Sequence, residues 1–225
     1  MANSTPISKH GKAVIFDLDG TLLDTLEDIG TSVNQALKAF KFPEHPINSF
    51  RFFIGDGWRM LVTRALPEDA RSEKVITECI TFSRKIYTDN WNRSTRLYDG
   101  IPELLDQLKE IGIPMAVVSN KPHEFTLRYA AAYLSEWQFN VVLGQTKDFK
   151  PKPDPASALE VARRIGLPPT EFLFVGDSGV DMKTASAAGM HPVGVAWGFR
   201  GPEELKENGC RKFITEPNQL MQLIG

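Results

Sequence analysis

The sequence contains little cysteine and no long hydrophobic segment. Its 225 residues include only two cysteines, Cys79 and Cys210, which lie far apart in the chain. Two distant cysteines argue against a disulfide-stapled scaffold and against a zinc site built from thiolates. No apolar run approaches the roughly 20 residues that a membrane-spanning helix needs. We therefore expect no membrane partner.

A strong excess of either charge is also missing. The chain has 26 Lys and Arg against 28 Asp and Glu, a formal net charge of -2. Without a basic excess, bulk charge gives no reason to expect nucleic acid as a partner. The polar start, MANSTPISKHGK, lacks the apolar region of a secretory signal, so we expect the cytoplasm. The sequence does not choose between a monomer and a homodimer.

Five short apolar segments have the character of buried strands. Their apolar residues are nearly continuous, which is typical of strands covered on both faces. Helical patterns separate them, and alternation of this kind predicts a parallel, doubly wound (Rossmann-like) α/β sheet. The predicted strands are residues 12–17, 113–120, 139–144, 171–177 and 192–197.

One region interrupts the alternation of strands and helices. Between residues 25 and 96 the sequence shows helical periodicity and no convincing strand. Thr25 and Asp28 have the spacing of a capping box at the start of the first of these helices. We therefore expect a helical domain over 25–96, inserted after the first strand of a core formed by 1–24 and 97–225.

Polar side chains follow several of the predicted strands where each strand ends. Asp17 and Asp19 end the first strand, Ser119-Asn120 the second and Asp177 the fourth, and Lys150 lies in the loop after the third. In a doubly wound sheet, ligands bind beyond the carboxyl ends of the strands. These side chains should therefore lie around one rim of the sheet.

Each of these residues also has a purely structural explanation. Two aspartates can simply end a strand, and Asp177 and Asp181 can favour the N-terminus of a helix. Ser119 can cap a helix and Lys150 can be a solvated loop cation. Their joint occurrence at one rim favours chemistry instead. Carboxylates suit Mg²⁺ and can attack phosphorus, and a lysine offsets the negative charge of a phosphoryl group.

Four segments that carry these residues resemble the motifs of the haloacid dehalogenase-like hydrolases. In chain order they read FDLDGTLLDT, VVSN, KPKPDP and VGDSGVDMKTASAAG. Together they span the whole core. The resemblance also implies that the helical insert is a cap of the C1 type, the kind placed between the first and second motifs.

The resemblance implies a role for each catalytic residue. Asp17 would be the nucleophile that becomes phosphorylated. Asp19 would protonate the leaving alcohol and then deprotonate the attacking water. Lys150 would pair with Asp17 and the phosphoryl oxygens, because the K-P-x-P-D register favours it over Lys152, its only competitor.

The resemblance also implies a Mg²⁺ site and a phosphate site. The metal ligands would be the side chains of Asp17 and Asp177 and the backbone carbonyl of Asp19, with Asp181 steadying the water around the ion. Besides Lys150, the expected phosphoryl contacts are Thr21, Ser119 and Asn120.

The second aspartate favours phosphoryl transfer, because dehalogenases of this superfamily lack it. The substrate is then a small phosphorylated metabolite. The segment FFIGDGWRMLVTRALP (52–67) resembles the cap loop and helix of bacterial phosphoglycolate phosphatases. On this basis Gly55 and Gly57 would turn toward the site, and Arg59 or Arg64 would bind a substrate carboxylate, unless both are solvated helix residues. Asp56 departs from the pattern, since an acid there would repel an anionic substrate unless it faces away.

Other activities remain open at this point. Within enzymes they are a sugar-phosphate phosphatase, a pyrophosphatase and a mutase of the β-phosphoglucomutase type. A protein that binds a phosphorylated ligand or a partner without turnover is a further alternative, although it would not require the full set of Asp17, Asp19, Lys150 and Asp177.

Overall fold

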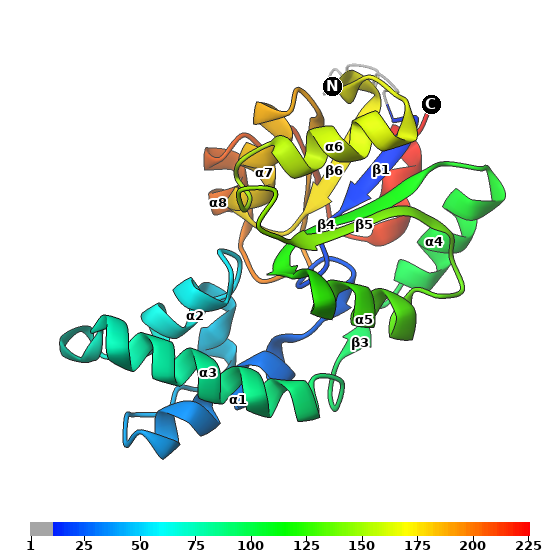
Figure 1. Ribbon diagram of the computed structural model, residues 1–225. Helices are drawn as coiled ribbons and strands as arrows, with labels where there is room; N and C mark the ends of the chain where they lie inside the picture. Colours follow the sequence, from blue (N-terminus) through cyan, green and yellow to red (C-terminus); the bar gives the residue numbers. More distant parts are fainter. Residues whose placement is uncertain (1–10) are drawn as a thin grey trace, which may run out of the picture.

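The computed structural model describes residues 11–225. Residues 1–10, which belong to the expected core segment 1–24, lie outside the described residues. The described part folds into an α/β core domain with a helical cap (Figure 1). No helix within residues 11–225 is both long enough and apolar enough to cross a membrane.

A six-stranded parallel sheet forms the centre of the core domain. Its strand order is β5-β4-β1-β6-β7-β8. The strands are β1 (Ala13–Phe16), β4 (Met115–Pro122), β5 (Phe139–Gln145), β6 (Phe172–Gly176), β7 (His191–Val195) and β8 (Lys212–Ile214). The first five lie at the predicted segments. Strand β8 was not predicted, because only Ile214 of its three residues is buried and so short an edge strand leaves no apolar pattern.

Helices cover both faces of the sheet, and the burial of β1 shows why its sequence is continuously apolar. Val14 and Phe16 belong to the hydrophobic cluster that includes α4, whereas Ala13 and Ile15 belong to the cluster that includes α6 and α7. The core helices are α4 (Ile101–Glu110), α5 (His123–Tyr133), α6 (Ala156–Ile165), α7 (Gly179–Ala187) and α8 (Pro202–Glu207), with short 3₁₀ helices η3 (Pro169–Glu171) and η4 (Pro217–Leu223).

The cap is inserted after β1 and lies beyond the carboxyl ends of the strands (Figure 1). Two short antiparallel strands, β2 (Leu23–Asp24) and β3 (Arg96–Leu97), pair where the chain leaves and re-enters the core. Between them lie α1 (Leu26–Ala39), η1 (Ile47–Phe52), α2 (Trp58–Ala65), η2 (Glu68–Ala70) and α3 (Glu73–Asn90). The limits 25–96 for this domain stay a prediction.

The predicted capping box at the start of α1 is wrong. Thr25 precedes the helix, but its side chain makes no capping hydrogen bond. The carboxylate of Asp28 instead accepts hydrogen bonds from the backbone amides of Ser94 and Thr95, at 3.0 and 2.9 Å. Contacts between segments distant in the sequence therefore replace the local cap and join α1 to the segment that returns to the core.

Candidate active site

A pocket opens between the rim of the sheet and the cap. It encloses about 550 Å³ of space, part of it open to solvent. Its lining includes carboxylates from the ends of β1 and β6, polar residues of β4 and apolar side chains of the cap. The lining residues used below are Asp17, Asp19, Ile54, Gly55, Gly57, Trp58, Leu61, Ser119, Asn120, Lys121, Asp177, Phe199 and Arg200. The rim predicted from the strand ends is therefore the floor of this pocket.

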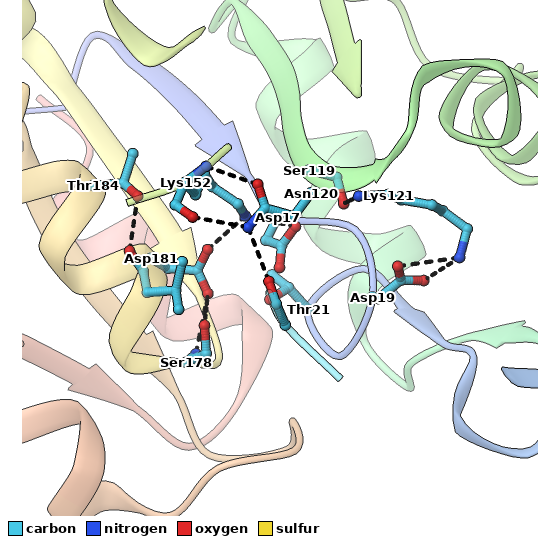
Figure 2. A network of polar contacts seen from close by, with 12 residues as sticks. Asp17, Asp19, Thr21, Ser119, Asn120, Lys121, Lys152, Ser178, Asp181 and Thr184 are labelled. Carbon is cyan, nitrogen blue, oxygen red and sulfur yellow. Dashed lines mark hydrogen bonds and ion pairs between the residues drawn. The ribbon is translucent and has the colours of Figure 1, made fainter. Parts of the chain in front are cut away.

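The nucleophile candidate Asp17 lies against a buried lysine, as Figure 2 shows. The lysine is Lys152, whose Nζ lies 2.9 Å from Asp17 Oδ1 and donates to Asp181 Oδ1 at 2.7 Å. Burial raises the pKa of Asp17 to about 7 against the lowering effect of Lys152, and the charges of Asp181 and Asp19 add to the rise. Burial alone would lower the pKa of Lys152, but Asp17 and Asp181 outweigh it and raise that pKa. Lys152 is thus a fixed positive charge beside Asp17.

The structure corrects the prediction that Lys150 pairs with Asp17. Lys150 is exposed in the loop after β5, while Lys152 is buried. Asn120 at the end of β4 determines this choice: its Oδ1 accepts from the Lys152 backbone amide at 2.7 Å and its Nδ2 donates to the Lys152 carbonyl at 3.0 Å. Both lysines begin a K-P-x-P sequence, so spacing alone could not separate them. The hydrogen bonds between Asn120 of β4 and the backbone of Lys152 distinguish the two lysines.

Three carboxylates crowd together at the floor of the pocket. Asp17, Asp177 and Asp181 each offer an oxygen within 4.8 Å of the others, and all three side chains are buried. Burial, followed by repulsion from Asp181 and Asp17, raises the pKa of Asp177 to about 8. Lys152 contacts two of these carboxylates but supplies only one positive charge for the three, and hard carboxylate oxygens are the ligands that Mg²⁺ prefers. The described residues therefore fit a divalent metal ion.

Gly20 is needed because Asp177 approaches the backbone of the first motif closely. Its φ of +87° lies in the left-handed region, and a Cβ there would come within 2.4 Å of Asp177 Oδ2. The same Oδ2 accepts a hydrogen bond of 2.7 Å from the backbone amide of Phe199. Thr21 is buried, and its hydroxyl donates to Asp177 Oδ1 at 3.4 Å, so it contacts this carboxylate and is not among the pocket-lining residues.

Asp181 caps a helix, as its structural explanation predicts, and also contacts the buried lysine of the site. Its Oδ2 accepts from the Ser178 amide at 3.1 Å and the Ser178 hydroxyl at 2.6 Å, which completes a capping box at the start of α7. Its Oδ1 holds Lys152. The helix cap thus fixes a carboxylate that orients the lysine of the site.

Asp19 has partners different from those of Asp17, although both line the pocket (Figure 2). Its carboxylate accepts from the Thr25 hydroxyl at 2.8 Å and from Lys121 Nζ at 2.9 and 3.1 Å. Lys121 was not predicted. It directly follows Asn120 in the sequence, and this position next to a predicted rim residue is the signal that could have found it; the structure extends β4 through Pro122 and so includes it.

Aromatic rings hold Lys121 in position. Its Nζ lies 5.0 Å from the ring centre of Tyr87 and 4.6 Å from that of Tyr129. Tyr87 comes from the cap helix α3 and Tyr129 from the core helix α5, and their hydroxyls are hydrogen bonded at 2.6 Å. The partner of Asp19 is therefore anchored by the cap and the core together.

The two remaining phosphate-site candidates differ in what they can offer a ligand. Ser119 lines the pocket, and its hydroxyl oxygen accepts from the Lys121 amide at 3.2 Å, which leaves its proton free to be donated. Asn120 also lines the pocket, but its side chain is fully engaged with backbone groups: besides both groups of Lys152, it donates to the Gly55 carbonyl at 3.0 Å. Asn120 is thus placed to position two loops.

The glycines of the cap loop line the pocket, whereas the arginines of the cap do not. Gly55 and Gly57 line the pocket, as predicted, whereas Asp56, Arg59 and Arg64 are not among its lining residues. Arg64 forms an ion pair with Asp56, and Arg59 forms one with Glu73 on α3. The charge of Asp56 is thus balanced outside the pocket, and neither arginine is placed to bind a substrate carboxylate.

Comparison with known proteins adds to this geometry. The sequence model of a family described as haloacid dehalogenase-like hydrolase matches residues 14–195. A phosphoglycolate phosphatase of Nitrosospira multiformis is 34% identical over 217 residues, which cover 95% of each chain. One of Haemophilus influenzae is 37% identical over 221 residues, covering 95% of this chain and 98% of the relative.

Solved structures of phosphatases have a fold similar to that of this chain. The crystal structure of a predicted phosphoglycolate phosphatase from Haemophilus somnus has a TM-score of 0.87 at 28% identity, covering 96% of this chain and 99% of its own. A predicted phosphatase from Clostridium acetobutylicum has a TM-score of 0.82 at 26% identity, covering 95% and 97%. The similarity extends over the cap as well as the core.

Proposed function

Because the chain belongs to the haloacid dehalogenase-like hydrolases and is an enzyme of their phosphatase kind, we propose that it hydrolyses a phosphate monoester through a covalent aspartyl-phosphate on Asp17. The observation that carries the proposal is the buried contact of 2.9 Å between Asp17 and Lys152 at the floor of the pocket. It places a carboxylate nucleophile beside a fixed positive charge, as attack on an anionic phosphoryl group requires.

The reaction takes place in two displacements. A carboxylate oxygen of Asp17 forms a bond to phosphorus while the ester P–O bond breaks, and the departing alkoxide takes a proton from Asp19. Asp19 then removes a proton from a water molecule, whose oxygen attacks phosphorus, and the Asp17–P bond breaks to release phosphate. Lys152 balances charge on the phosphoryl oxygens throughout, and the hydroxyl of Ser119 donates to one of them.

The metal proposed for the site is Mg²⁺. The side chains of Asp17 and Asp177 and the backbone carbonyl of Asp19 would hold it, with Asp181 ordering its water shell. When bound, the ion supplies positive charge that offsets repulsion between substrate and carboxylates. The crowding of the three buried carboxylates supports this proposal.

The substrate proposed is 2-phosphoglycolate. The two relatives from Nitrosospira multiformis and Haemophilus influenzae carry that activity in their names. The cap side of the pocket is lined by apolar side chains such as Ile54, Trp58 and Leu61, which suit a short leaving group better than a hydroxyl-rich sugar. We further propose that the enzyme acts in the cytoplasm as a monomer or homodimer.

A panel of phosphorylated metabolites assayed with Mg²⁺ tests the proposal. We expect the largest kcat/KM for 2-phosphoglycolate, and loss of phosphate release when EDTA removes the metal. Phosphate release by a contaminating enzyme is measured with Asp17→Asn protein purified in parallel. Higher kcat/KM for hexose phosphates or pyrophosphate would overturn the substrate assignment. Phosphate release that persists in EDTA would overturn the metal assignment.

Thermal unfolding at several pH values tests the metal site without an activity assay. Burial in the fold raises the pKa of Asp17 from its ordinary value of 3.8 to about 7 and that of Asp177 to about 8. The metal-free fold therefore binds more protons than the unfolded chain between about pH 4 and pH 8, and its stability should fall as the pH rises across this range. Mg²⁺ binds the ionised carboxylates, so the rise in Tm on adding Mg²⁺ should be larger at pH 8 than at pH 6.

The matched variant for this measurement is Asp177→Asn, which removes one proposed ligand and one buried charge. Its metal-free Tm should depend less on pH, and Mg²⁺ should raise it less. A Tm of the unmodified protein that does not respond to Mg²⁺ at pH 8 would contradict the proposed site.

A further inference from the structure

Arg200 is a positively charged residue of the pocket that none of the four motifs contains. It follows β7 in the loop before α8, and only 9% of its side-chain surface is exposed. It lines the same pocket as Asp17 and Asp19. A nearly buried guanidinium beside a phosphatase nucleophile requires an explanation, since arginine is rarely buried without partners.

The partners of Arg200 account for only part of its hydrogen-bonding capacity. Its Nε lies 3.1 Å from Glu204 Oε2, and its Nη2 donates to the carbonyl of Ile54 in the cap loop at 2.8 Å. Its Nη1 is buried and has no hydrogen-bond partner. A charged donor left unpaired in the interior costs free energy that a bound anion would recover. The free Nη1 therefore indicates an anion-binding position.

Other positive charges already serve the phosphoryl end of the pocket. Lys152 lies against Asp17, and Lys121 is occupied by Asp19. Arg200 is bonded to the cap loop instead, among the apolar side chains of Ile54 and Phe199 that form that wall. An anion at Nη1 would thus belong to the leaving group, on the cap side of the phosphoryl group.

We propose that Arg200 is the residue that selects the substrate, by binding through Nη1 a carboxylate one or two carbon atoms from the phosphorylated oxygen. The substrate class is short phosphorylated hydroxy acids. This inference rests on the proposed phosphatase activity. It moves the role expected of Arg59 or Arg64 in the cap to a residue of the core, because both cap arginines are paired with acids outside the pocket.

A purely structural role is the alternative, in which Arg200 only ties the cap loop to the core. Arg51 offers a matched control for that role. It lies in the cap helix η1 and donates to the carbonyls of Phe199 and Gly198 in the core, at 2.7 and 2.9 Å. Like Arg200 it joins cap to core through carbonyls, but it does not line the pocket.

The test compares two substrates that differ in the carboxylate, 2-phosphoglycolate and ethyl phosphate. The quantity measured is the ratio of their kcat/KM values, which cancels general losses of folding or cap closure. We expect wild-type enzyme to prefer 2-phosphoglycolate. Arg200→Met should lower the ratio about 10- to 100-fold, the range that follows from loss of a charged hydrogen bond. Arg51→Met should leave the ratio within about threefold of wild type.

Several outcomes would overturn the inference. An unchanged ratio in Arg200→Met would remove Arg200 from substrate selection. If kcat/KM fell equally for both substrates, Arg200 would have only the structural role. If Arg200→Met does not fold, Arg200→Gln keeps a polar side chain but removes the charge, and an unchanged ratio there has the same meaning. Wild-type turnover of both substrates without preference contradicts this inference and the substrate assignment but leaves the proposed phosphatase activity intact, whereas turnover of neither contradicts the proposed phosphatase activity itself.

Discussion

Replacing Asp17 with Asn should reduce phosphate release by at least about 10⁴-fold, because the amide oxygen is a poor nucleophile and cannot form the aspartyl-phosphate. The substitution preserves shape and removes one charge. Asp17 is buried, and its pKa is raised to about 7, so the fold already tolerates its neutral form near neutral pH. We therefore expect a folded protein that is inactive. Steady-state phosphate release and a thermal melt, both at saturating Mg²⁺, measure the two effects.

The same chemical change at an exposed acid is the control for this prediction. Asp69 is exposed in η2 of the cap, and Asp69→Asn should retain wild-type kcat. Wild-type turnover in Asp17→Asn would show that the covalent mechanism is wrong. A loss of activity accompanied by unfolding would show only that Asp17 supports the fold, and the melt distinguishes this case.

The second large effect should separate two lysines that stand two residues apart. Lys152→Met should reduce kcat by about 10³-fold, because it removes the positive charge held 2.9 Å from Asp17. Lys150→Met should leave kcat within about twofold of wild type, since Lys150 is exposed. The pair tests the one catalytic assignment that the structure changed.

Stability should also differ between the two variants. Lys152 is the shared partner of two buried carboxylates, and its removal leaves both without their cation. We expect Lys152→Met to lower the Tm of the metal-free protein and Mg²⁺ to restore part of it, whereas Lys150→Met should not change the Tm. If Lys150→Met were the inactive variant, the sequence register would be correct and the placement of this loop wrong.

Local sequence was sufficient to predict that a side chain lies at the rim of the sheet wherever the residue directly follows a buried strand. Asp17 and Asp177 follow β1 and β6 at once, so the continuous apolar pattern of each strand carries its aspartate to the rim. Ser119 lies inside β4, which continues through Pro122, and it also lines the pocket. Parallel strands bring their carboxyl ends to one edge, and that topology follows from the alternation of strands and helices.

The sequence by itself therefore determined five strands of the sheet, the inserted helical region and the carboxylates of the site. Tertiary structure alone decided which lysine meets Asp17, because Asn120 on a distant strand fixes the backbone of Lys152. It likewise paired Lys121 with Asp19 and placed Arg200, not Arg59 or Arg64, in the pocket. These charges lie in loops, at a strand extension and on the cap, where no periodic pattern sets direction. Their positions depend on partners far away in the chain.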